Sequence, residues 1–139
     1  MSAGRVKATT VADLLGTEGL VPVTVHLSWR ASDPYAVELL FLAPDPDADD
    51  VSWLVARDLL AEGLSWPAGI GDVHVRPDPA DCETTVLVLS HDGRAEFEFL
   101  TEELSEFLHV TYDHIPPGAE YTALDLDTQI AQLLEGETR

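Results

Sequence analysis

The sequence predicts an α+β fold, a mainly antiparallel β-sheet of about seven strands with three helices in the order ββββαβββαα. Most apolar segments alternate with polar residues at a period of two, which is typical of strands with one buried face. Short connections rich in glycine, proline and aspartate separate these segments and favour antiparallel hairpins. Helical spacing is confined to one short central segment and two segments near the C-terminus.

The N-terminal part of the chain predicts two strands. The first covers residues 6–15 and ends at a glycine turn, residues 16–19. In the second, residues 21–29, valine, leucine and tryptophan alternate with polar residues, so one face is buried. The turn that follows contains Asp33 and Pro34, whose side chains favour a reversal of the chain.

The third and fourth strands flank an acidic loop. Residues 35–42 carry apolar side chains on both faces, which predicts a central strand and an oligomer that covers the surplus apolar surface. Residues 44–50 form a proline-broken loop with alternating aspartates. The fourth strand follows at residues 51–55.

A short helix over residues 56–62 follows, because its apolar residues repeat at i and i+4. Gly63 is predicted to end it in the left-handed conformation. Residues 67–71 then form a tight loop in which glycine permits positive φ, and residues 72–76 form a strand.

The last strands and helices are predicted from equally local signals. A strand over residues 84–90 leads through a hairpin at 91–93 into a strand with Ala95, Phe97 and Phe99 on its inner face. A helix begins at Thr101 and is broken at residues 115–118 by two prolines and a glycine. A third helix covers residues 126–134.

Composition excludes several classes of protein. With 139 residues, 45% of them apolar, the chain is long enough for one domain over residues 1–139, with flexible ends at 1–5 and 136–139. Seven basic and 26 acidic residues give a net charge of −19, which disfavours binding to nucleic acid or to an anionic membrane surface. No apolar run is long enough to span a bilayer. A single cysteine, Cys82, cannot form an internal disulfide, so a cytoplasmic location is expected.

No motif indicates catalysis, a metal or a cofactor. The five histidines lack zinc-ligand spacing, and the aspartates of loop 44–50 lack the glycine and glutamate of a calcium loop. Cys82 lies between two acidic residues, whose negative charge disfavours a thiolate and makes it a poor nucleophile candidate. Glu96 and Glu98 fit an outward polar strand face better than a glycosidase pair. We therefore expect a protein that is not an enzyme and has no cofactor.

Two residues are candidates for protein interaction. Trp66 follows the short helix in a loop, where a tryptophan can anchor a partner or can pack against its own helix. Arg57 is one of few cations in an acidic chain, and either a partner or a carboxylate of the same chain can pair with it.

A set of short motifs together resembles the SsgA-like family of actinomycete sporulation and cell-division proteins. The matching segments are Leu27-Ser28-Trp29, Asp33-Pro34-Tyr35-Ala36-Val37, Arg57-Asp58-Leu59-Leu60-Ala61-Glu62-Gly63-Leu64, Pro67, Gly69, Gly71-Asp72-Val73, Val75, Phe107-Leu108, Thr111, Pro116-Pro117-Gly118, Glu120, Asp125-Leu126-Asp127 and Leu133-Leu134. They extend over roughly residues 20–135, and they are specific as a set although no single one is.

The resemblance implies a small, acidic, non-enzymatic regulator of sporulation-specific septation. It implies a fold like that of the whirly single-strand nucleic-acid-binding proteins, assembled as a trimer. It also implies that the partner is the tubulin-like division protein FtsZ, whose ring the chain would recruit or help to assemble at the septum. Two alternatives stay open: a single-stranded nucleic-acid-binding module, which seven scattered cations disfavour, and an acidic chaperone for a basic client.

Overall fold

The computed structural model describes residues 4–91 and 93–120, and these form one antiparallel sheet with two helices. The elements are β1 (Arg5–Gly16), β2 (Gly19–Arg30), β3 (Asp33–Phe41), β4 (Val51–Ala56), α1 (Arg57–Gly63), β5 (Ala68–Ile70), β6 (Val73–Asp78), β7 (Asp81–Ser90), β8 (Arg94–Leu100) and α2 (Thr101–His114). The predicted α+β class and the antiparallel pairing are confirmed. The third predicted helix, residues 126–134, lies outside the described residues.

The strand count of about seven is wrong by one in the described part of the chain, which has eight strands. The additional strand is β5, in the segment predicted to be a loop, and its Gly69 pairs with His74 of β6. A Cβ atom at Gly69 would collide with the imidazole of His74, so glycine is required here by close packing. A three-residue strand that has Gly69 at its centre and Gly71 directly after it carries no periodicity from which it could be predicted.

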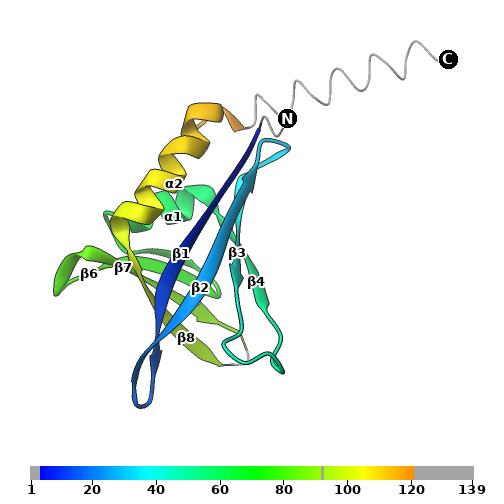
Figure 1. The fold of residues 1–139 in the computed structure, drawn as a ribbon. Helices are drawn as coiled ribbons and strands as arrows, with labels where there is room; N and C mark the ends of the chain where they lie inside the picture. The colour runs from blue at the N-terminus through cyan, green and yellow to red at the C-terminus, as the bar shows by residue number, and fades with distance from the viewer. Residues whose placement is uncertain (1–3, 92, 121–139) are drawn as a thin grey trace, which may run out of the picture.

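The sheet has the order β4-β3-β2-β1-β8-β7-β6-β5 and divides into two halves. β1 and β2 pair along their whole length, but β1 meets β8 at only two register positions, Asp13↔Glu98 and Leu14↔Phe97. Figure 1 shows β1–β4 running steeply across β6–β8, with α2 beside the upper part of β1. The narrow β1–β8 contact is therefore where the sheet turns.

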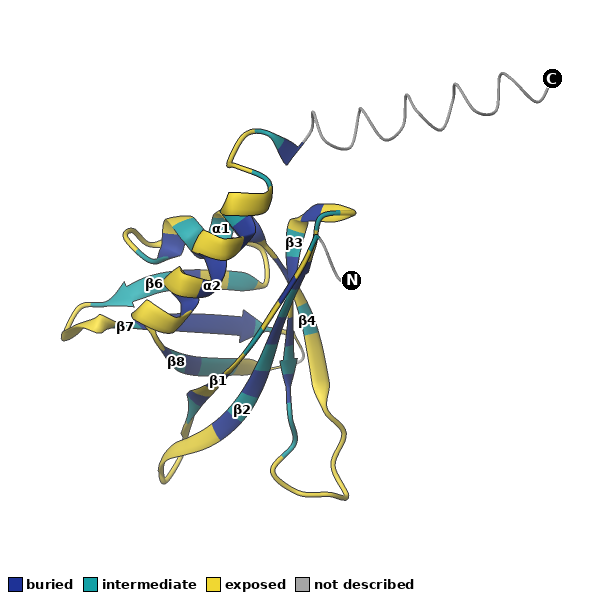
Figure 2. Ribbon diagram, turned by 45° about the horizontal axis from the view of Figure 1, so that its top comes forward, coloured by how far each residue is buried: buried dark blue, intermediate teal, exposed yellow. Residues whose placement is uncertain are grey.

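The core lies in the angle between these two half-sheets and beneath the helices. Trp29, Leu39, Leu87, Phe99 and Leu60 are almost fully buried there, and they come from both halves of the sheet and from α1. In Figure 2 the centre of β7 is buried, whereas much of β4 is exposed. β3 pairs with β2 on one side and with β4 on the other, so it is an interior strand of the sheet, but it buries one face only, although both faces are apolar in sequence.

Two turn predictions had opposite outcomes. Gly71 has a φ of 60°, as predicted, and Gly93 closes the β7–β8 hairpin with a φ of 137°. Gly63 at the end of α1 does not have positive φ, so the predicted left-handed stop is wrong. A Cβ at Gly63 would collide with the side chain of Val75, which shows that this glycine lets α1 approach β6 closely.

Candidate functional site

Arg57 is the first residue of α1, and its side chain is fully buried. Its Nη2 atom donates a hydrogen bond to Oε2 of Glu120 at 2.8 Å, and Nη1 donates to the carbonyl oxygen of Thr111 at 3.2 Å. The guanidinium carbon lies 4.1 Å from the ring centroid of Tyr112 and 5.3 Å from that of Trp29. A planar arginine suits this site because it can stack on rings and form ion-pair hydrogen bonds at once.

Glu120 is the carboxylate that compensates the charge of Arg57. It is 3% exposed, and its Oε1 atom also accepts a hydrogen bond from the backbone N–H of Gly118 at 2.8 Å. Burial by itself would raise the pKa of Glu120, but the hydrogen bonds from Arg57 and from backbone N–H groups outweigh it and lower the pKa. The carboxylate is therefore ionised and ties the chain after α2 to the start of α1.

A second contact joins the same two helices at the surface. The hydroxyl of Tyr112 donates to Oδ1 of Asp58 at 2.9 Å. Burial and this hydrogen bond raise the pKa of Tyr112 well above its ordinary value. Tyr112 thus connects α2 to α1 through its hydroxyl while its ring covers Arg57.

These contacts decide between the two interpretations of Arg57. The guanidinium pairs with a carboxylate of its own chain and presents no surface to a partner in this structure. The sequence analysis considered such a pair, but it could not name Glu120, which lies 63 residues away. The only signals were a lone arginine at the start of an apolar helix and a glutamate after a Pro-Pro-Gly break.

Trp66 lies beyond the other end of α1 and, unlike Arg57, is exposed. Its side chain is 69% exposed, and its backbone N–H donates to the carbonyl of Glu62 at 3.0 Å. The backbone is thus held to the helix, while most of the indole is exposed. Ile70, at the end of β5, is 79% exposed. Trp66 and Arg57 do not form one site, and Trp66 alone is placed where a partner could reach it.

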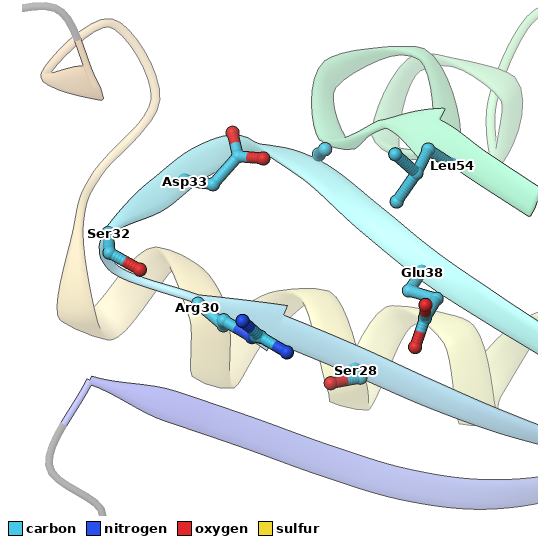
Figure 3. Close-up of a pocket in the computed structure, with 7 residues that line it drawn as sticks. Ser28, Arg30, Ser32, Asp33, Glu38 and Leu54 are labelled. Carbon is cyan, nitrogen blue, oxygen red and sulfur yellow. The ribbon is translucent and has the colours of Figure 1, made fainter.

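A polar cavity of about 230 Å³ lies on the outer face of β2–β4 and is shown in Figure 3. Ser28, Arg30, Asp33, Glu38 and Leu54 line it. The carboxylate of Glu38 accepts a hydrogen bond from Ser52 at 3.1 Å. The cavity combines an arginine with two carboxylates and contains no histidine or cysteine, so it holds neither a Ser–His nor a Cys–His pair.

The other polar residues considered in the sequence are dispersed. No group of three histidine, cysteine, aspartate or glutamate side chains among residues 4–91 and 93–120 is placed to hold a metal ion. Cys82 is exposed, and Glu96 forms an ion pair with Arg94 at 2.6 Å. In the same part of the chain no helix is both long enough and apolar enough to cross a membrane.

Comparison with known proteins identifies the family. The model of the family described as Streptomyces sporulation and cell division protein, SsgA, matches residues 23–120. The chain belongs to the SsgA family. The match begins in β2 and ends at Glu120, so both members of the buried Arg57–Glu120 pair lie inside it.

Individual SsgA-family proteins match most of the chain. The sporulation-specific cell division protein SsgB of Saccharopolyspora erythraea is 43% identical over 130 residues, which are 92% of this chain and 91% of that protein. SsgB of Streptomyces coelicolor is 37% identical over 123 residues, with 87% and 88% covered. The family resemblance inferred from short motifs is therefore confirmed over most of the chain.

Solved structures of the SsgA family share the fold. The crystal structure of an SsgA-like sporulation-specific cell division protein from Thermobifida fusca has a TM-score of 0.83 at 32% identity and covers 95% of this chain and 97% of that chain. A structure from a study of SsgB mutations and longitudinal cell division in sporulating Streptomyces coelicolor has a TM-score of 0.79 at 34% identity, with 88% and 98% covered.

Proposed function

We propose that this chain is a non-enzymatic regulator of sporulation-specific cell division that acts as a scaffold for other proteins. In this proposal it recruits FtsZ, or promotes assembly of the FtsZ ring, at the cytoplasmic side of the division septum. The observation that carries the proposal is the near full-length match to proteins named sporulation-specific cell division protein. A role in binding is also consistent with two observations on the described residues: no group of three potential metal-ligating side chains is placed to hold a metal ion, and the polar cavity on β2–β4 contains no histidine or cysteine.

Trp66 is the residue that we expect to contact the partner. An exposed tryptophan supplies a large, rigid apolar surface, and such residues often dominate the energy of an interface. Its backbone is held by α1, so the indole projects from a fixed position. Arg57 contributes indirectly, because it fixes the start of α1, the helix that precedes Trp66.

The test is co-sedimentation of the purified chain with FtsZ polymers formed with GTP, together with light scattering to follow assembly. We expect the chain to pellet with polymers and Trp66→Ala to bind about 30-fold more weakly, as for a dominant interface residue. Leu15→Ala is the matched control, because Leu15 is also an exposed apolar side chain, at the far end of the β1–β2 hairpin. If neither pelleting nor a change in assembly occurs at low salt, the proposal is wrong.

The proposal includes self-association into a trimer and concentration at septa. Sedimentation equilibrium at micromolar concentration measures the first, and a purely monomeric chain would contradict it. A fluorescent fusion in a sporulating actinomycete measures the second. Foci at septa are expected, and a diffuse signal would argue against the role.

One observation favours a second candidate, binding to single-stranded nucleic acid. Arg5 and Arg30 are register partners across β1–β2, and with Lys7 they line an outer-face cavity of about 280 Å³. Glu38 lines the same cavity, and the chain as a whole carries −19. A gel shift with a single-stranded oligonucleotide separates the two functions. Binding at physiological salt that Arg30→Ala abolishes would support this candidate, and we expect none.

A further inference from the structure

β4 is an edge strand without the usual protection against pairing. In the described sheet it pairs only with β3, and the register is unbroken over six positions from Ala36↔Ala56 to Phe41↔Val51. It contains no charged residue, no proline and no bulge, and Val51 and Leu54 are 51% and 67% exposed. The opposite edge, β5, is only three residues long. Proteins commonly protect sheet edges by such shortness or by charge, so the open edge of β4 is unusual.

An apolar cavity adjoins the inner face of this edge. Its volume is about 300 Å³, and β4 contributes Val51 and Trp53 to its wall. Phe41 from β3 and Leu89 and Phe97 from the other half-sheet face them. In an extended segment alternate side chains point to the same face, about 7 Å apart. A strand added to β4 would therefore direct every second side chain toward this cavity.

An acidic loop leads directly into the same strand. Two of its carboxylates accept backbone hydrogen bonds: Asp45 from the N–H of Asp47 at 3.0 Å, and Asp50 from the N–H of Ala43 at 2.8 Å. The carboxylates of Asp47 and Asp49 form no ion pair with the described residues, and Asp49 lines the apolar cavity. A segment lying along β4 would thus meet negative charge at the N-terminal end of the strand.

We propose that β4 binds an extended segment of a partner protein as an additional strand. The segment has apolar residues at alternate positions, which enter the cavity, and lysine or arginine at the end that lies beside loop 44–50. Since every pair in the sheet is antiparallel, the added strand is antiparallel to β4. Its basic end is then its C-terminal end, because that end lies beside Val51. This site is separate from Trp66 and does not depend on the partner being FtsZ.

The probe is a synthetic peptide, acetyl-Ser-Val-Thr-Val-Ser-Ile-Thr-Lys-Lys-amide, titrated against the full chain at about 50 mM salt. Three controls are used: a peptide with the lysines at the N-terminal end, a peptide with the apolar residues placed consecutively, and a single-stranded oligonucleotide in place of peptide. Binding is followed by isothermal titration calorimetry, and amide hydrogen exchange of β4 is followed by NMR. We expect the first peptide to bind most tightly and to protect the amides of β4 selectively.

Two variants test the two parts of the site. Asp47→Asn combined with Asp49→Asn removes charge from the loop, and we expect affinity to fall roughly threefold to tenfold and its salt dependence to weaken. Glu102→Gln combined with Glu106→Gln changes net charge equally on exposed positions of α2 and is the matched control. Ala95→Leu fills the cavity from β8 without altering β4, and it should weaken binding while the fold is retained, as circular dichroism checks.

Three results would overturn the proposal. The first is failure of the alternating peptide to bind at millimolar concentration. The second is binding without new protection in β4, which would place the peptide elsewhere. The third is protection of β4 that is present before peptide is added and rises with protein concentration, which would assign the edge to a second copy of the chain. A failure of the FtsZ experiments would leave each of these readouts unchanged.

Discussion

Removal of the charge of Glu120 is the most informative perturbation of the fold. Glu120→Gln preserves the size of the side chain and one oxygen acceptor, but it leaves the fully buried guanidinium of Arg57 without a compensating charge. Arg57 Nε has no hydrogen-bond partner among the described residues, so few other polar contacts would remain to the guanidinium after the substitution. The substitution therefore isolates the electrostatic part of the contact that ties the chain after α2 to α1.

The expected magnitude follows from burial. Loss of one partner of a buried ion pair costs about 3–5 kcal/mol of unfolding free energy. In this protein the carbonyl of Thr111, at 3.2 Å, and the ring of Tyr112, at 4.1 Å, still contact the guanidinium, so we expect the lower end, about 3 kcal/mol. For a domain of this length that corresponds to a fall of about 10 °C in Tm.

Urea denaturation followed by circular dichroism measures the change, with Glu62→Gln, an exposed position on α1, as the control. The double variant Arg57→Met/Glu120→Leu removes both charges, and we expect it to be more stable than Glu120→Gln alone. A cost below about 1 kcal/mol for Glu120→Gln would mean that Arg57 does not need this carboxylate. The account of the buried pair would then be wrong.

Two further predictions concern acid stability and helix packing. The folded protein holds the pKa of Glu120 below its ordinary value of 4.5, so the carboxylate stabilises the fold above pH 4.5, and this contribution is lost as pH falls through the lowered pKa. Urea midpoints measured between pH 6 and pH 3 should therefore fall less steeply for Glu120→Gln than for the parent chain. Equal slopes would contradict this prediction. Gly63→Ala should lower the free energy of unfolding by about 1–3 kcal/mol despite the better helix propensity of alanine, because the new Cβ would overlap the side chain of Val75. Thermal unfolding measures this change, with Ser65→Ala as the control. An unchanged or raised Tm would refute the packing argument.

The local part of the fold was predictable from residue patterns. The β7–β8 hairpin illustrates why: Phe97 and Phe99 alternate with Glu96 and Glu98, and Gly93 supplies the positive φ of the turn. The acidic loop and the break after α2 were equally clear, since proline and glycine act within a few residues. β5 was not predicted, because a three-residue strand is defined by its pairing with β6 and carries no sequence pattern of its own.

The candidate sites were predicted less completely. Trp66 was identified correctly as a loop tryptophan, but its exposure depended on how the connection leaves α1. The roles of Arg57 and Gly63 required contacts with Glu120 and Val75, which are distant in sequence. The edge of β4 was not predicted either, because the residues of the strand do not indicate whether a second neighbour lies beyond it.

The sequence by itself determined the class of the protein, most of its strands and turns, its family and its strongly acidic character, because alternation, turn residues and charge are properties of neighbouring residues. Only the tertiary structure decided that Arg57 is an interior ion-pair partner, that Gly63 is a contact point between helix and sheet, and that β4 ends the sheet beside an apolar cavity. Each of these depends on which distant segments pack together. Burial changes how much the same charged or polar side chain contributes to the stability of the fold.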